Sequence, residues 1–197
     1  GEAAQISYLK SGLGWNKKMK IFVTHLHGDH CIGLLGLLQT MTMQHRIETL
    51  EIYGPSWIEE FISANIKVLN FGLSFSVIIT IVEEGIIFDS KIYSIYACKA
   101  NHSVTTYSYL FVEKDKPGRF NIEKVKALAI PEGKLWNQLQ NGIEIKIEGR
   151  IILPEQVLGE KRPGKKIGIS GSSLFWWYAD ACHHQAIWNG GVHPPGH

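Results

Sequence analysis

Cysteine, net charge and long apolar runs are all scarce in this 197-residue sequence. Its three cysteines, Cys31, Cys98 and Cys182, are odd in number and widely spaced, which fits neither a disulfide framework nor the ligand spacing of a zinc ribbon. We therefore expect a reducing, cytoplasmic environment. A formal net charge of +2 is far from the strongly basic composition that would by itself indicate nucleic-acid binding.

The sequence also lacks any apolar run long enough to cross a bilayer. Residues 1–5 have none of the charged and then apolar layout of a signal peptide. These absences predict a protein that has no membrane segment and is not exported. With 45% hydrophobic and 19% charged residues, the composition is that of a globular protein long enough to bury a core.

The pattern of apolar residues predicts an α/β fold. Residues 20–24 form a β-branched and aromatic run typical of a buried strand, and the apolar residues of 32–38 are spaced like one face of a helix. Ser56 is expected to cap a helix that extends to about Lys67. Further strands are expected at 50–53, 77–82, 92–96, 107–112 and 166–170, and two short helices between 121 and 142.

A cluster of metal-binding residue types, His-Leu-His-Gly-Asp-His, follows the first of these strands at positions 25–30. Imidazole nitrogens and carboxylate oxygens are the usual ligands of catalytic zinc. Alternation along an extended chain points His25 and His27 the same way, and the next glycine lets Asp29 and His30 reach a second position. The pattern thus predicts two metal ions close together. A surface cluster, or one used only structurally, is the alternative interpretation.

This string resembles the signature metal motif of the metallo-β-lactamase superfamily. Its surroundings resemble ribonuclease Z, the family of nucleases that trim the 3′ end of precursor tRNA. The resemblance is carried by residues 1–5, 24–38, 100–103, 107–109, 113–121 and 161–171. Residues 113–164 resemble the substrate-binding arm that separates ribonuclease Z from other members of the superfamily.

The resemblance implies an αββα sandwich, in which two mixed sheets pack face to face with helices outside and the metals at one sheet edge. It implies a metallo-β-lactamase-like domain over residues 1–171, incomplete at both ends, with the inserted arm at 113–164. Residues 172–197 would then be an atypical tail. The family resemblance also implies precursor tRNA and a second copy of the chain, in a homodimer, as partners.

The resemblance further implies that His25, His27 and His102 bind one zinc ion and that Asp29 and His30 bind the other. The expected function is a zinc-dependent endoribonuclease that removes the 3′ trailer from precursor tRNA by means of a metal-activated water. Asp29 would also be catalytic, as the acceptor of a proton. Without its flanking strand and serine, His102 would be interpreted as an ordinary core or surface histidine.

Basic residues of the arm are candidates for binding the tRNA backbone, because phosphate contacts supply most of the affinity of such complexes. The candidates named for substrate binding are Lys114, Lys116 and Arg119, and Lys124, Lys126 and Lys134 share their character. Acidic residues alternate with them: Glu113, Asp115, Glu123 and Glu132. A solvated, charge-balanced face is therefore an equally open interpretation.

The family pattern breaks where the arm has returned. The family has a metal-bridging aspartate at the position of Ser172, and its last zinc-binding histidine has no counterpart here. Asp180, His183 and His184 could in principle supply ligands. Because both the bridging aspartate and the last histidine of the family are missing, the second zinc site is expected to be incomplete. It should then bind zinc less tightly than the first.

Residues 172–197 contain many tryptophans and histidines but no lysine, arginine or glutamate. An out-of-frame reading, a foreign extension or a natural truncation would each explain this change.

Two alternatives to an active nuclease stay open. One is a catalytically impaired chain that binds tRNA or a partner through the arm, and the other is a different hydrolase of the same superfamily.

Overall fold

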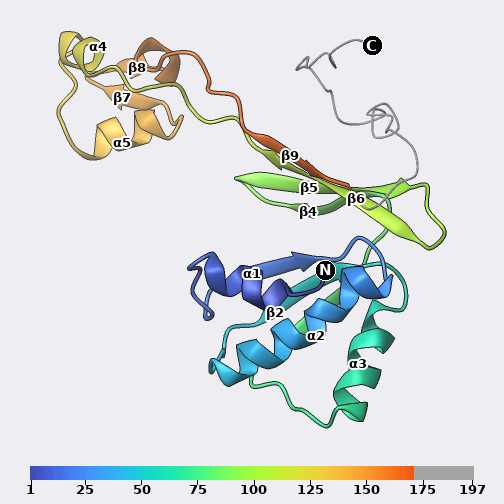
Figure 1. The fold of residues 1–197 in the computed structure, drawn as a ribbon. Coiled ribbons are helices and arrows are strands. Elements are labelled where there is room, and N and C mark those ends of the chain that lie inside the picture. The colour runs from blue at the N-terminus through green and yellow to red at the C-terminus, as the bar shows by residue number, and fades with distance from the viewer. Residues whose placement is uncertain (171–197) are drawn as a thin grey trace. The chain divides into compact units, whose positions relative to one another are not determined.

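The computed structural model describes residues 1–170, which form two compact units (Figure 1). Unit 1 contains residues 1–89, 95–111 and the described residues from 167 onward, and unit 2 contains residues 90–94 and 112–166. The predictions for the tail at 172–197, including Ser172, Asp180, His183 and His184, lie outside the described residues.

Three sheets organise the chain, in the strand orders β1-β2-β3, β4-β5-β6-β9 and β7-β8. The first half of the chain contains α1 (Ala4–Lys10), β1 (Met19–Phe22), α2 (Gly28–Met43), β2 (Leu50–Gly54), α3 (Ile58–Val68), β3 (Val77–Ile81) and β4 (Gly85–Asp89). The remainder contains β5 (Tyr93–Ala100), β6 (Thr106–Glu113), α4 (Ile122–Ala127), α5 (Lys134–Gln140), β7 (Ile145–Ile147), β8 (Arg150–Ile152), a 3₁₀ turn (Pro154–Gln156) and β9 (Lys166–Ile169). None of the helices in residues 1–170 is both long and apolar enough to span a membrane.

The two faces of the first sheet pack against different layers, as the side chains of its central strand β2 show. It pairs in parallel with β1 on one side and with β3 on the other. Leu50 and Ile52 are fully buried in a core shared with α2 and α3. Tyr53 belongs instead to a second core, with Ala97 of β5 and Tyr109 of β6. Because strand side chains alternate between faces, helices cover one face and the second sheet packs on the other.

Helix α1 contacts α2 where the latter has two glycines (Figure 1). A Cβ atom at Gly33 would overlap the backbone carbonyl of Gly1. A Cβ atom at Gly36 would lie 2.8 Å from the side-chain oxygen of Gln5. The close approach at Gly33 therefore requires a residue without a side chain, whereas at Gly36 the end of the flexible Gln5 side chain could move away from a Cβ atom.

Arg46 joins two loops of unit 1 through hydrogen bonds to backbone carbonyls. Its side chain is fully buried. Nη1 donates a hydrogen bond to the carbonyl of Trp15 (2.5 Å), and Nη2 donates to the carbonyls of Lys17 and Thr49 (3.0 Å each). The guanidinium fork thereby connects the segment before β1 to the segment before β2, and its geometry matches several acceptors at once.

Two sequence predictions about helix starts are wrong. Helix α2 begins at Gly28, so Asp29 and His30 lie in its first turn and not in a loop before it. Apolar spacing misses this turn because its residues are polar. Helix α3 begins after Trp57, whose φ is 75°, and Ser56 does not cap it. The sequence also gave no sign of α1, β4 or the β7-β8 hairpin, and β5 extends further than expected.

We predict that Arg46→Lys destabilises unit 1 by about 2–4 kcal/mol, because an ammonium cannot reach three carbonyls in the geometry of the guanidinium fork and leaves buried acceptors unpaired. Chemical denaturation followed by circular dichroism measures the change. Arg150→Lys, at an exposed position of β8, is the matched control and should change stability by less than about 0.5 kcal/mol. Equal stabilities of the two variants would contradict the role of Arg46.

Candidate metal centre

The chain beyond β1 is held between the two sheets of unit 1. The backbone N–H of Val23 donates to the carbonyl of Tyr53 in β2 (2.8 Å). On the other side, the N–H of Tyr107 donates to the carbonyl of Thr24 (2.9 Å), and the hydroxyl of Tyr109 donates to the carbonyl of Val23 (2.7 Å). These bonds fix the position at which the following histidines leave the sheet.

Three histidines from distant parts of the sequence meet at this point. His25 and His27 follow β1, whereas His102 comes from the loop between β5 and β6. Their candidate ligand atoms all lie within 4.8 Å of one another. His102 Nε2 lies 3.1 Å from His27 Nδ1, and the ring of His25 stands nearly perpendicular to both other rings, with centroid distances of 4.9 Å. Such an arrangement can surround a single metal ion.

The hydrogen-bonding state of the cluster fits a metal ion. His25 is completely buried, and its Nε2 has no partner. The same holds for His102 Nδ1. Buried polar atoms without partners are rare because they cost free energy, so both nitrogens indicate a site built for a further ligand. Imidazole is also the commonest metal ligand in proteins.

Burial lowers the pKa of His25, and the neighbouring His30, His102 and His27 lower it further, whereas Asp29 acts in the opposite direction. A lowered pKa keeps the ring of His25 neutral. Neutral imidazole is the form that binds a metal. The electrostatics of the cluster and its geometry therefore favour the same chemistry.

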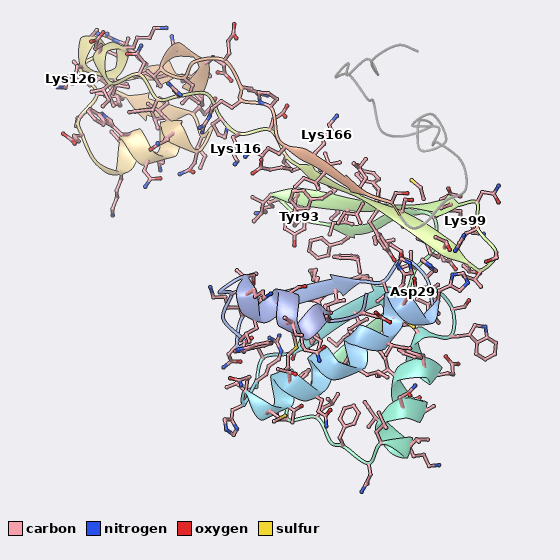
Figure 2. All side chains as sticks on the ribbon, in the orientation of Figure 1. Asp29, Tyr93, Lys99, Lys116, Lys126 and Lys166 are labelled. Atoms are coloured by element: carbon pink, nitrogen blue, oxygen red, sulfur yellow. The ribbon has the colours of Figure 1, made fainter. Side chains whose placement is uncertain are left out.

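Asp29 and His30 occupy a different position, in the first turn of α2 (Figure 2). Asp29 Oδ2 lies 3.2 Å from His30 Nε2, and the Asp29 side chain is 70% exposed. The ring of His30 stacks at a tilt near His25, with a centroid distance of 4.2 Å. The group of three histidines does not include these two residues. The structure thus gathers the first predicted ligand set and leaves Asp29 and His30 as an adjacent pair.

The three arm candidates all lie in unit 2. Lys116 forms an ion pair with Glu113 (2.5 Å), and that hydrogen bond, together with one from the backbone of Lys165, lowers the pKa of the Glu113 carboxyl. The backbone of Lys114 donates to the carbonyl of Ile92 (2.8 Å). Arg119 lies at an exposed position beside a cavity. Their role in substrate binding stays a prediction.

Two residues beside the predicted ligands contact the histidines. Sequence reasoning missed Thr24, and it used Ser103 only as support for the assignment of His102. Thr24 Oγ1 lies 3.0 Å from His25 Nδ1, which leaves Nε2 as the nitrogen available to a metal. Ser103 Oγ lies 3.5 Å from His27 Nε2. The only available signal was their position in the chain, since each directly adjoins a predicted ligand. Partners of this kind set the tautomer and orientation of metal-binding histidines.

No protein-family model matches the chain. A curated ribonuclease Z from Nitrosopumilus maritimus is 71% identical over 174 residues, which cover 88% of this chain and 58% of that relative. Most of the chain is therefore similar in sequence to part of a ribonuclease Z. A ribonuclease Z from Listeria welshimeri is 38% identical over 174 residues, which cover 88% of this chain and 57% of that relative. The chain thus spans well under two thirds of the length of these ribonuclease Z relatives.

The solved structure of the short form of human tRNase Z is similar to this chain, with a TM-score of 0.50 and 29% identity. The similarity covers 58% of this chain and 51% of the human protein. Together with the helix, sheet and sheet layers of unit 1, it confirms the predicted α/β metallo-β-lactamase fold. The predicted resemblance to ribonuclease Z is confirmed as well.

We predict that Thr24→Val weakens divalent metal binding about tenfold or more, because His25 loses the partner that fixes its Nδ1. The absorption spectrum of bound cobalt(II) reports both affinity and ligand geometry. Thr24→Ser retains the hydroxyl and should bind like the unchanged chain. Thr40→Val, within α2, is the matched control, since the Thr40 hydroxyl donates to the carbonyl of Gly36 within the same helix. Unchanged cobalt binding in Thr24→Val would contradict the prediction.

Proposed function

We propose that this chain carries the metal centre of a tRNA-processing endoribonuclease that removes the 3′ trailer from precursor tRNA. The observation that carries the proposal is the group of His25, His27 and His102, in which His25 is buried and two ring nitrogens have no partner. Its occurrence in a relative of ribonuclease Z supports this reaction over the other hydrolytic reactions considered above. A cytoplasmic location and a homodimeric state stay predictions.

Zinc is the metal that suits this donor set, because three imidazoles with one open position are typical of catalytic zinc sites. His25, His27 and His102 would hold one ion, and Asp29 and His30 would contribute to a second. When bound, zinc supplies positive charge that stabilises the attacked phosphate and lowers the pKa of water.

Asp29 is proposed as the proton acceptor of the reaction. Its carboxylate is exposed in the first turn of α2, next to the predicted ligands His27 and His30, where water can reach it. The carboxylate would take a proton from the attacking water as the new oxygen–phosphorus bond forms. The bond between phosphorus and the 3′ oxygen then breaks, and the leaving oxygen takes a proton from solvent, so the trailer keeps the phosphate and the tRNA keeps a 3′ hydroxyl.

A chain that binds RNA without cleaving it is the second candidate. One observation favours it: among residues 1–170, Asp29 and His30 pair with each other, and the only group of three or more ligand types is the histidine cluster. The predicted bridging position, Ser172, lies outside the described residues. Cleavage and metal content together separate the two candidates.

His27→Ala should abolish zinc-stimulated cleavage of a precursor tRNA, because the cluster would lose one of its three imidazoles. His45→Ala removes an exposed histidine of the same unit and should cleave at the unchanged rate. Gel analysis of an end-labelled precursor measures both the rate and the site of cutting. Absence of cleavage by the unaltered chain with added zinc would leave the binding-only candidate.

Zinc should bind with two different affinities. The three-histidine group is expected to retain about one equivalent of zinc after mild chelation, whereas zinc held by Asp29 and His30 is lost, because fewer ligands hold it. Elemental analysis before and after the chelator provides the measurement. His27→Ala should then retain less than the unaltered chain. Retention of two equivalents would contradict the proposed difference between the sites.

A further inference from the structure

Unit 2 contains a cavity of about 740 Å³ that the proposed metal centre does not use. Its lining combines two guanidinium groups, two aromatic rings and two side-chain amides, from Arg119, Arg162, Phe120, Trp136, Gln140 and Asn141. Cavities with a few convergent polar groups on an apolar wall are typical of ligand sites.

The aromatic wall is anchored by the core of unit 2. The rings of Phe120 and Trp136 lie 5.7 Å apart between centroids at an angle of 50°. Trp136 Nε1 donates to the carbonyl of Ile130 (2.9 Å), and both rings pack against buried residues that include Val125 and Leu139. The two rings are therefore held in place without a ligand.

The charge of the lining has one sign. Arg119 and Arg162 contribute two positive charges, and no carboxylate is among the described residues that line the cavity. Arg162 Nε donates to the carbonyl of Pro117 (3.1 Å), which positions the guanidinium and leaves its terminal nitrogens for a ligand. Guanidinium groups bind phosphate through paired hydrogen bonds.

Two nearby acidic side chains are engaged elsewhere. Glu113 pairs with Lys116, and Asp115 Oδ1 accepts a hydrogen bond from the backbone of Gly164 (3.0 Å). Among residues 1–170, neither Arg119 nor Arg162 forms an ion pair with a carboxylate. The alternation of charges in the sequence conceals this separation.

We propose that this cavity binds one unpaired nucleotide of single-stranded RNA, with the base against Phe120 and Trp136 and the phosphate at Arg119 and Arg162. The substrate class rests on the proposed function. Aromatic faces stack on any base, and cationic groups hold its phosphate. A duplex keeps its bases stacked on one another and cannot place one in the cavity. Single strands are therefore preferred over duplexes.

The test measures binding of the full chain to fluorescently labelled RNA by anisotropy. The probes are a single-stranded pentanucleotide, the same pentanucleotide with abasic sugars, and a short duplex. Stacking of one base predicts binding about tenfold tighter for the ordinary single strand than for the abasic one. Equal affinity for these two probes would overturn the proposal, as would tighter binding of the duplex.

Variants assign the effect to the cavity. Arg119→Gln and Arg162→Gln should each reduce the slope of log affinity against log salt by about 0.7, the loss of one phosphate contact in a single strand. Lys146→Gln removes a charge from β7, outside the cavity lining, and is the matched control. A reduction of the slope by Lys146→Gln equal to that of the arginine variants would overturn the assignment.

Trp136→Ala should abolish the difference between ordinary and abasic RNA. Because Trp136 also packs on the core of unit 2, Trp136→Phe provides the second variant, which keeps an aromatic face and should keep most of the difference. The proposed position of the base would be overturned if Arg162→Gln lost the difference between ordinary and abasic RNA while Trp136→Ala kept it.

The same experiments separate this inference from the proposed nuclease. Base-dependent RNA binding that persists in His27→Ala supports the cavity whether or not the chain cleaves precursor tRNA. Cleavage of precursor tRNA without base-dependent binding would overturn the cavity proposal and leave the proposed nuclease intact.

Discussion

The short segment of Val23 and Thr24 is the constraint on which unit 1 depends, because it bonds to both sheets. Its amide is held by Tyr53 in β2, and its carbonyls are held by Tyr107 and Tyr109 in β6. A segment fixed on both sides cannot shift relative to either sheet. The segment from β1 to His25 is thereby brought to the loop that carries His102, although 77 positions separate the two histidines by number, since 102 − 25 = 77. The meeting of the histidines at this edge follows from sheet packing.

Neighbouring candidate ligands differ in how deeply they are buried, and so in their chemical environment. His25 is enclosed, and desolvation lowers its pKa and leaves a nitrogen without a partner. Asp29 lies two positions beyond His27 but projects from the first turn of α2 and is largely exposed. An enclosed imidazole suits metal coordination, whereas an accessible carboxylate suits the proposed proton transfer. One six-residue string thus supplies two environments because the backbone changes from extended chain to helix within it.

Unit 2 shows how three-dimensional structure can separate charges that alternate in sequence. Local pairs such as Lys116 with Glu113 neutralise the extended segments. Arg119 and Arg162 are 43 positions apart, since 162 − 119 = 43, yet they line the same cavity beside aromatic rings. The sequence left two interpretations of the arm open: basic residues that bind the tRNA backbone, and a charge-balanced face. The structure differs from both, because cationic and aromatic side chains are concentrated at one cavity.

The sequence by itself determined the α/β class, the resemblance to ribonuclease Z and the positions of the candidate ligands, because buried strands and ligand clusters leave short, dense signals. It could not determine where α2 begins, since a polar first turn has no apolar spacing. Nor could it identify Thr24 as the partner of His25 or join Arg162 to Trp136. Only the tertiary structure decided these points, because hydrogen-bond partners and cavity walls are set by sheet pairing and core packing between distant segments.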